Sequence, residues 1–557
     1  MDINETDIKK IYTLAIKSHR ENNLIAAEKL YNQVLKINSY HFESNFYLAS
    51  LYAQKNNLDK SKDFFKKAIK IQPNYALSYS NLAAVLKELN EFEEAIKVCE
   101  EAIKIDPNNV SSLINLGAIL KELGRFKESI NACEQVIKID SKNVMAYQNL
   151  ALALIELGEI TEAINCYNKL AKIESNYEKY YENLGQLNIV LGNNKEAIKF
   201  YQLAIKNDPE KLNNYYHLSG LDKKILNTHL KEIINKILLK DEKNYKNLAF
   251  ANFLLSKYEA GLKNYEKEFN YLLKGHSYFL ASEKKQYKND IEYWLDVLPN
   301  NEEINKFKIS NKKTENQNSL KPIFIVGVPR SGSTLVEKII TSGSEKVLAG
   351  EEIGILSILV KRNVIKKESI YNDIKKLKLT LIERYKQRKL VLDKDSNTFT
   401  DKTLDNFFYI GLIKEIFPNA KVINCKRKPI ESIMSILKNN LPAIPWTHNL
   451  EHIFKYFDIY YKTIAHYEKT IPNFIYSLDY EKLVHEPEIE SKKLMKFCDL
   501  PWDQKCLEFY KRKDLISKTA SNIQIRQAIY KDSLKKYLPY KKFLYEHGKK
   551  YSWFNIT

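Results

Sequence analysis

The chain has 557 residues, of which 44% are hydrophobic and 28% are charged, and its 88 Lys and Arg outnumber its 69 Asp and Glu to give a formal net charge of +19. This length exceeds one hydrophobic core, and the composition is that of a globular protein rather than a disordered or fibrous one, so we expect at least two domains. No run of about 18 apolar residues is present, so no membrane span is expected.

The excess of positive charge favours anionic partners. The Lys residues are spread along the whole chain, which is typical of solvated faces, and no nucleic-acid partner is predicted. Residues 1–7 are polar and lack the apolar core of a signal peptide, and the six cysteines form no metal-ligand pair. Together these features predict a cytoplasmic protein in a reducing compartment.

A repeat of 34 residues runs from the N-terminus to about residue 210. Small residues let two antiparallel helices approach closely, and a Pro or Ser after the second helix ends it. A single pair cannot bury its apolar face, so neighbouring pairs are expected to stack into a superhelix. Two positions mark the repeat, one in each helix of the pair: Leu48, Leu82, Leu116, Leu150, Leu184 and Leu218, and Ala27, Ser61, Ala95, Ser129, Ala163 and Ala197.

This pattern resembles the tetratricopeptide repeat in about six copies. The resemblance implies an all-α superhelix over residues 1–220, whose groove binds a peptide or a protein; a purely structural spacer is the alternative. Residues 221–307 continue with helical spacing, with a less regular pair at 248–275, and are expected to cap the array. Residues 308–320 are rich in Lys, Asn, Ser and Thr without an apolar period, which predicts a linker.

Residues 321–557 are expected to form an α/β domain with a mainly parallel sheet. The domain opens on a buried strand at 323–326, a turn of small residues at 327–334, and a helix that follows. Backbone N–H groups converge where a strand, a Gly/Ser turn and a helix N-terminus meet, and they cradle an anion. The loop is P-loop-like, but Ser333 stands where a Walker A loop has Lys, and the cation is Arg330 instead.

The segment Pro-Arg-Ser-Gly-Ser-Thr-Leu, which begins at Pro329, resembles the phosphosulfate-binding loop of sulfotransferases, and most closely that of protein-tyrosine sulfotransferases and their bacterial relatives. Sulfotransferases use 3′-phosphoadenosine-5′-phosphosulfate (PAPS). The resemblance therefore implies PAPS as co-substrate, with its 5′ side bound by the loop residues Arg330, Ser331, Gly332, Ser333 and Thr334.

Later motifs follow in the family's order. The Gly-Glu-Glu at 350–352 matches the segment that supplies the catalytic base, and by this alignment the base is Glu352. The chain has one residue more than the family between the loop and this motif, so Glu351 remains the alternative base. If the motif has no catalytic role, it is a solvated acidic turn. The Asp-Lys at 401–402 matches the segment whose Lys contacts the sulfuryl group, so the resemblance gives that role to Lys402. Arg330 is the second catalytic cation.

The segment at 421–437 reads as a strand with a charged end and a helix with Pro in its first turn. It resembles the family's 3′-phosphate motif, in which Arg427 and Ser435 would bind the phosphate; a planar guanidinium and a hydroxyl donor suit that task. Lys428 replaces the Asp of many relatives. Tyr480 matches a Tyr near the nucleotide, with a core Tyr as the alternative, and a C-terminal segment offers Ser521 and Lys536 as further contacts.

Together with the repeats, the chain resembles bacterial tetratricopeptide-repeat sulfotransferases. This resemblance implies transfer of a sulfuryl group to a hydroxyl, with protein tyrosine in an acidic peptide as the favoured acceptor and the repeats recruiting it. No metal is predicted, because Arg330 and Lys402 would neutralise the charge. The alternatives are the same chemistry on a carbohydrate or another small hydroxyl acceptor, a non-catalytic nucleotide-binding scaffold, and a P-loop kinase, which the missing Walker Lys disfavours.

Overall fold

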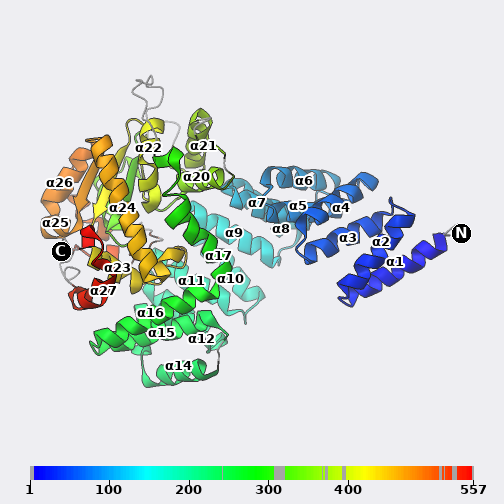
Figure 1. Cartoon of the computed structure of the whole chain (residues 1–557), viewed down its shortest axis with the longest axis horizontal. Helices are drawn as coiled ribbons and strands as arrows, with labels where there is room; N and C mark the ends of the chain where they lie inside the picture. Colours follow the sequence, from blue (N-terminus) through cyan, green and yellow to red (C-terminus); the bar gives the residue numbers. More distant parts are fainter. Residues whose placement is uncertain are drawn as a thin grey trace. The chain divides into compact units, whose positions relative to one another are not determined.

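The structure is a computed structural model, and it describes residues 5–240, 243–305, 320–366, 368–370, 374–391, 397–512, 517, 519, 521–522, 524–529 and 536–554. Except for Leu320, the linker expected at 308–320 lies outside the described residues. Backbone contacts divide the chain into two compact units, Met1–Ser175 and Asn176–Thr557 (Figure 1).

Antiparallel helix pairs form the repeat array, as the 34-residue spacing predicts. Ala27, Ser61, Ala95, Ser129, Ala163 and Ala197 are all fully buried at the contact between the two helices of a pair. The helices are α1 Glu5–Arg20, α2 Leu24–Ile37, α3 Phe42–Gln54, α4 Leu58–Ile71, α5 Ala76–Glu88, α6 Phe92–Ile105, α7 Val110–Glu122, α8 Phe126–Ile139, α9 Val144–Leu157, α10 Ile160–Ile173, α11 Glu178–Leu191, α12 Asn194–Asn207 and α13 Leu212–Leu221.

The turn inside each pair contains one left-handed residue at a fixed place in the repeat. Its φ lies between 57° and 84° in every copy: Asn22, Asn56, Asn90, Gly124, Gly158 and Gly192. Asn and Gly are the residues that adopt this conformation at least cost. The first three repeats therefore use Asn and the last three use Gly for the same turn.

Further helices connect the array to the C-terminal domain within the second unit. They are α14 Thr228–Lys240, α15 Tyr245–Gly261, α16 Tyr265–Ser282, α17 Lys284–Glu292, the π-helical turn η2 Tyr293–Val297 and α18 Glu302–Asn305. Helices α15 and α16 form the less regular pair expected at 248–275. Helix α16 also packs on the C-terminal domain, where Lys438 forms an ion pair with Glu268 at 2.6 Å.

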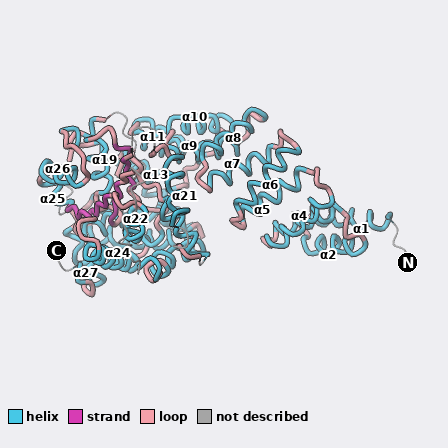
Figure 2. Tube along the Cα trace, turned by 90° about the horizontal axis from the view of Figure 1, so that it is seen from above, coloured by secondary structure: helices cyan, strands magenta, loops and turns pink. Residues whose placement is uncertain are grey.

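A five-stranded parallel sheet forms the centre of the C-terminal domain, as expected (Figure 2). The strand order is β2-β3-β1-β4-β5, and every neighbouring pair is parallel. All residues of the central strand are buried, because helices cover both faces. The strands are β1 Ile323–Gly327, β2 Val347–Leu348, β3 Thr398–Asp401, β4 Lys421–Lys426 and β5 Ile475–Asp479.

The helical segments of this domain follow the strands in alternation. Pro429 stands in the first turn of α23, as the sequence predicts, whereas the helix expected after Lys402 begins with a 3-10 segment. The segments are α19 Ser333–Gly343, α20 Ile355–Lys366, α21 Ile374–Gln387, η3 Leu404–Tyr409, α22 Ile410–Ile416, α23 Pro429–Leu437, η4 Pro445–His448, α24 Leu450–Thr470, α25 Tyr480–His485, α26 Pro487–Phe497, η5 Gln504–Cys506, η6 Phe509–Lys511, η7 Gln524–Arg526, η9 Leu538–Tyr540, α27 Lys541–Gly548 and η10 Ser552–Phe554.

Within the described part of the chain, no helix has an apolar stretch long enough to cross a membrane.

Candidate active site

The candidate residues gather because each strand of the sheet ends just before one of them. The loop with Arg330 follows β1, and the Gly-Glu-Glu turn at 350–352 follows β2. Lys402, Arg427 and Tyr480 come directly after β3, β4 and β5. Because all five strands are parallel, their carboxyl ends share one edge of the sheet, which is where ligands bind in open α/β folds.

The loop between β1 and α19 has the geometry of an anion cradle. Helix α19 begins at Ser333 and directs its first N–H groups toward the loop. Gly332 has φ 96°, and a Cβ placed on it would lie 2.4 Å from the Tyr480 ring, so only glycine fits there. The Ser331 hydroxyl is buried and has no hydrogen-bond partner among the described residues, which leaves a donor for a bound anion.

Arg330 holds its guanidinium with three hydrogen bonds. Nε donates to Ser435 Oγ at 3.0 Å, and the two terminal nitrogens donate to Ser521 Oγ at 2.8 Å and Gln524 Oε1 at 3.1 Å. The backbone of Arg330 has φ 70°, an uncommon value for a residue with a side chain. The loop therefore fixes this cation in one place, with two of the expected site residues, Ser435 and Ser521, as partners.

Arg427 lies next to Arg330 in the same cleft. Its NH1 donates to the backbone oxygen of Arg330 at 3.0 Å, and its guanidinium stacks on the Tyr480 ring at 4.5 Å. Arg330, Arg427, Tyr480 and Ser521 line one cleft with about 540 Å³ of empty space. The sequence analysis assigns Arg330 to the 5′ side of the nucleotide and Arg427 to its 3′-phosphate; the structure brings both cations to one cleft, where Arg427 bonds the Arg330 carbonyl. Tyr480 is a lining residue of this cleft.

Glu352 and Lys402 form a second part of the site. Lys402 Nζ donates to Glu352 Oε1 at 2.8 Å; the Lys402 side chain is fully buried, whereas that of Glu352 is 49% exposed. Burial alone would lower the pKa of Lys402, but the charges of Glu352 and Glu337 raise it above its ordinary value. Lys402 is therefore a fixed buried cation, and Glu352 is an accessible carboxylate held beside it.

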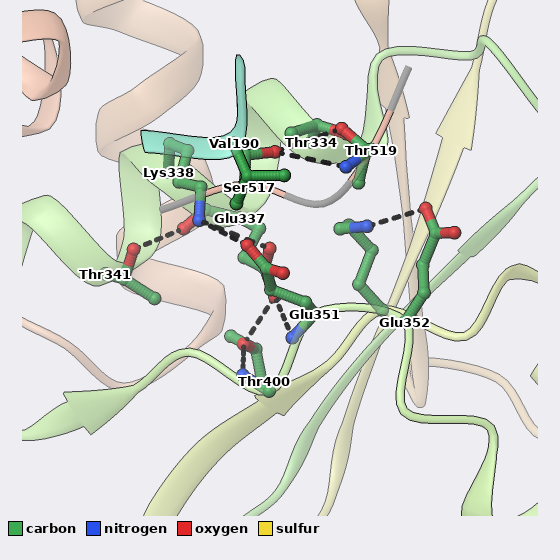
Figure 3. A network of polar contacts seen from close by, with 12 residues as sticks. Val190, Thr334, Glu337, Lys338, Thr341, Glu351, Glu352, Thr400, Ser517 and Thr519 are labelled. Carbon is green, nitrogen blue, oxygen red and sulfur yellow. Dashed lines mark hydrogen bonds and ion pairs between the residues drawn. The ribbon is translucent and has the colours of Figure 1, made fainter. Parts of the chain in front are cut away.

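Glu351 has a different environment, although it is the neighbour of Glu352. It has φ 55°, its side chain is 15% exposed, and its Oε1 pairs with Lys338 Nζ at 3.2 Å. Its backbone N–H donates to the buried Glu337 Oε1 at 3.0 Å, and Glu337 also accepts from Thr400 Oγ1 at 2.8 Å. In Figure 3, Glu351 lies beside these residues, whereas Glu352 points away from them. Glu351 thus anchors the turn, and Glu352 is left to face the site.

The neighbour of Lys402 is a further anchor. Asp401 is fully buried and accepts from the Tyr385 hydroxyl at 2.8 Å and from the Thr403 N–H at 3.0 Å. Burial raises the pKa of this carboxyl, and its hydrogen bonds oppose that rise. Strand β3 therefore ends in a fixed position, which orients Lys402.

The C-terminal candidates divide between the cleft and its surroundings. Ser521 bonds Arg330 and lines the cleft, together with Gln524. Lys536 is exposed and is not among the lining residues, although its charge lies near Arg427.

Sequence reasoning missed Glu337, Lys338 and Gln524. The first two form an adjacent charged pair on α19, a helix whose neighbouring positions are apolar and buried. A charged pair inside such a helix was the available signal, since charged residues are seldom buried without partners. Gln524 gave no signal in the sequence, because it lies in a polar segment and meets Arg330 only in the folded chain. Among the described residues, no group of three or more His, Cys, Asp or Glu is arranged to hold a metal ion.

Comparison with known proteins identifies both parts of the chain. Residues 322–504 match the family described as "Sulfotransferase family". Residues 42–75, 76–109, 98–131, 120–187 and 178–211 match families described as "Tetratricopeptide repeat".

Two curated relatives match over part of their length. An uncharacterised protein of Aquifex aeolicus (strain VF5) is 33% identical over 313 residues, which are 53% of this chain and 40% of that protein. Protein-tyrosine sulfotransferase A of Caenorhabditis elegans is 28% identical over 203 residues, which are 33% of this chain and 51% of that protein. The chain thus spans about half or less of the length of these relatives.

Two solved structures that resemble part of the chain are those of YrrB and PilW. YrrB, described as a TPR protein with an unusual peptide-binding site, is 18% identical and covers 33% of this chain and 96% of its own, with a TM-score of 0.30. PilW, a type IV pilus biogenesis factor, is 19% identical and covers 37% of this chain and 95% of its own, with a TM-score of 0.34.

Proposed function

Because the chain carries a sulfotransferase domain and an array of tetratricopeptide repeats, we propose that it transfers a sulfuryl group from PAPS to the hydroxyl of a protein tyrosine. The observation that carries this proposal is the meeting of Glu352, Lys402 and the Arg330–Arg427 cleft at one edge of the sheet. The similarity of part of the chain to a protein-tyrosine sulfotransferase favours tyrosine over other acceptors.

The donor set of the cleft fits a doubly phosphorylated nucleotide. The buried Ser331 hydroxyl and the N-terminus of α19 supply neutral donors for one phosphate. Arg427 supplies a planar cation, and Arg330, which is bonded to Ser435, supplies another. Lys428 stands where many relatives have Asp, which leaves this end of the cleft more basic.

In the proposed reaction, a new bond forms between the acceptor oxygen and sulfur, the bond from sulfur to the phosphate oxygen breaks, and adenosine 3′,5′-bisphosphate leaves. Glu352 takes the proton of the acceptor hydroxyl. Lys402 and Arg330 neutralise the negative charge that develops on the leaving oxygen. Fixed cations in a site that excludes water stabilise such charge strongly, and loss of one comparable donor costs about 3–4 kcal/mol of activation free energy.

Glu352 is the proposed base because of what surrounds the two carboxylates. Glu351 is fixed by Lys338 and turned into the protein. Glu352 is half exposed, so an acceptor hydroxyl can reach it, and its ion pair with Lys402 holds it in place.

The repeats are proposed to recruit the acceptor protein. In the second unit, α11 and α13 line a cavity of about 1730 Å³ of empty space together with α15, α16 and the loop at Asn440 and Pro442 of the sulfotransferase domain. Its walls carry acidic, basic and aromatic side chains, including Lys211, which pairs with Glu178 at 2.8 Å. A peptide held by the last repeats would therefore also contact the domain that carries Glu352.

The test is incubation of the purified chain with PAPS and a set of acceptors, with mass spectrometry of the products. An acidic peptide that contains tyrosine should gain one sulfuryl group, and the same peptide with Phe in place of Tyr should not. If only a carbohydrate gains a sulfuryl group, the proposed sulfuryl transfer holds, but the acceptor is not protein tyrosine. Binding of adenosine 3′,5′-bisphosphate without turnover on any acceptor would indicate the non-catalytic scaffold, and competition by ATP with Mg²⁺ instead of the bisphosphate would indicate a kinase.

A further inference from the structure

The Arg526 side chain links one wall of the cleft to the repeat array. Arg526 ends the short segment η7, and its NH2 donates to the backbone oxygen of Val190 at 2.8 Å. Val190 lies in the last turn of α11, and the two residues are 336 positions apart in the chain. The C-terminal carbonyls of a helix have no partner within it, so a cation is well placed there.

The same guanidinium occupies the space above Gly192. A Cβ on Gly192 would lie 2.4 Å from Arg526 Cζ, which is closer than two carbon atoms can approach. The contact therefore depends on the absence of a side chain at position 192.

The segment that contains Arg526 is also the wall of the cleft. Ser521 and Gln524 both accept hydrogen bonds from Arg330. Ile525 is 3% exposed, and its N–H donates to the Ser521 carbonyl at 3.1 Å, which joins the two ends of this short segment. Arg330 on one side and Val190 on the other thus hold the same stretch of chain.

We propose that Arg526 is a positioning residue, which fastens the 524–529 wall of the cleft to helix α11 so that the repeat array forms part of the nucleotide site. The proposal rests on the proposed function only in naming the nucleotide. Helix α11 also lines the cavity where we propose that the acceptor binds, through Glu182 and Gln186. Helix α11 is thus common to the two proposed binding sites, and any coupling between them must be reciprocal.

The repeats themselves provide the control for this contact. Gly158 is the equivalent residue one repeat earlier, with φ 84° against 81° for Gly192, but a Cβ on Gly158 would meet nothing within 4 Å. Asn occupies the same place at Asn22, Asn56 and Asn90. Asn is thus compatible with this turn, and at Gly192 its side chain would displace only the flexible end of Arg526.

The experiment compares Gly192→Asn, Gly158→Asn and Arg526→Ala with the parent chain by calorimetric titration of adenosine 3′,5′-bisphosphate. Gly192→Asn and Arg526→Ala should each weaken binding about tenfold, as expected for a lost hydrogen bond to a charged group. The double variant should be no weaker than either single variant, because both changes remove the same contact. Gly158→Asn should bind as the parent does, and equal affinity in the parent and all the variants would overturn the proposal.

A second measurement does not depend on the nucleotide. Hydrogen exchange at the Ile525 N–H should be faster in Gly192→Asn than in Gly158→Asn, because release of Arg526 loosens the segment. If the parent chain binds no bisphosphate, the proposed function fails, and this exchange rate still tests the contact. Equal exchange in the two Asn variants would show that Arg526 does not hold the segment.

Discussion

Arg427 donates a hydrogen bond to the backbone oxygen of Arg330 at 3.0 Å, so the end of β4 and the loop after β1 are joined directly. The bond supports the uncommon backbone conformation of Arg330, at φ 70°. Both arginines line the same cleft, and the buried Glu431 carboxylate, 3.8 Å from Arg427 NH2, offsets part of their positive charge. The remaining positive charge favours a bound anion in the cleft.

The Arg427→Ala variant should weaken binding of adenosine 3′,5′-bisphosphate by about 100-fold, because it loses a charge-assisted contact and also releases the Arg330 loop. Arg427→Lys should recover only part of that loss, since Lys keeps the charge without the planar fork that reaches both the Arg330 carbonyl and a phosphate. Calorimetric titration measures both. Adenosine 5′-monophosphate is the control ligand, and an equal loss for both nucleotides would contradict the assignment of Arg427 to the 3′-phosphate.

Glu352→Gln should lower kcat by about 10²–10⁴ and leave bisphosphate affinity near that of the parent, because it removes a general base without changing the cleft. Glu351→Gln should keep turnover nearer to that of the parent, and both variants should lower the melting temperature, since each breaks a pair with a buried lysine, Lys338 or Lys402. Single-turnover assays and thermal unfolding separate the two effects. If folded Glu351→Gln loses turnover while Glu352→Gln keeps it, Glu351 is the base.

The sequence predicts those parts of this site that follow from local pattern. A buried run before a Gly/Ser turn predicts β1 and its loop, and the Pro at 429 predicts the start of α23, because strand and helix signals lie within a few residues. The fixation of Glu351 by Glu337 and Lys338 could not be predicted, since it depends on how far α19 lies from the end of β2. The same holds for Arg526, whose partner Val190 belongs to the repeats.

Gly332→Ala should weaken nucleotide binding by tenfold or more and lower stability by about 1–3 kcal/mol. The residue has φ 96°, and the added Cβ would meet the Tyr480 ring, which also stacks on Arg427. Gly354→Ala is the matched control, with φ 61° and only Ile358 Cδ1 near its Cβ, at 3.9 Å. Calorimetric titration and thermal unfolding of both variants measure the difference, and similar losses in the two would show that backbone strain alone is responsible.

Stability should fall in acid because of a buried histidine pair between α16 and η4. His276 Nε2 bonds the Leu437 carbonyl at 2.8 Å, so Nε2 carries the proton, and His276 Nδ1 accepts from His448 Nδ1 at 2.9 Å. Both rings are therefore neutral in the folded protein. Burial lowers the pKa of His276 to about 4 and, together with the charge of His276, that of His448 to about 3.

Unfolded histidine has a pKa near 6.5, so the unfolded chain binds more protons than the folded one below that pH. Each ring makes its full contribution to the free energy of unfolding above pH ~6.5. That contribution is lost as the pH falls toward ~4, by up to about 1.4 kcal/mol per pH unit. His276→Gln keeps a donor for the Leu437 carbonyl and does not titrate, so its melting temperature should fall less than that of the parent between pH 7 and pH 4.5. His229→Gln, at an exposed position of α14, should follow the parent curve. If the melting temperatures of His276→Gln and the parent fall in parallel with pH, this histidine pair does not control stability in acid.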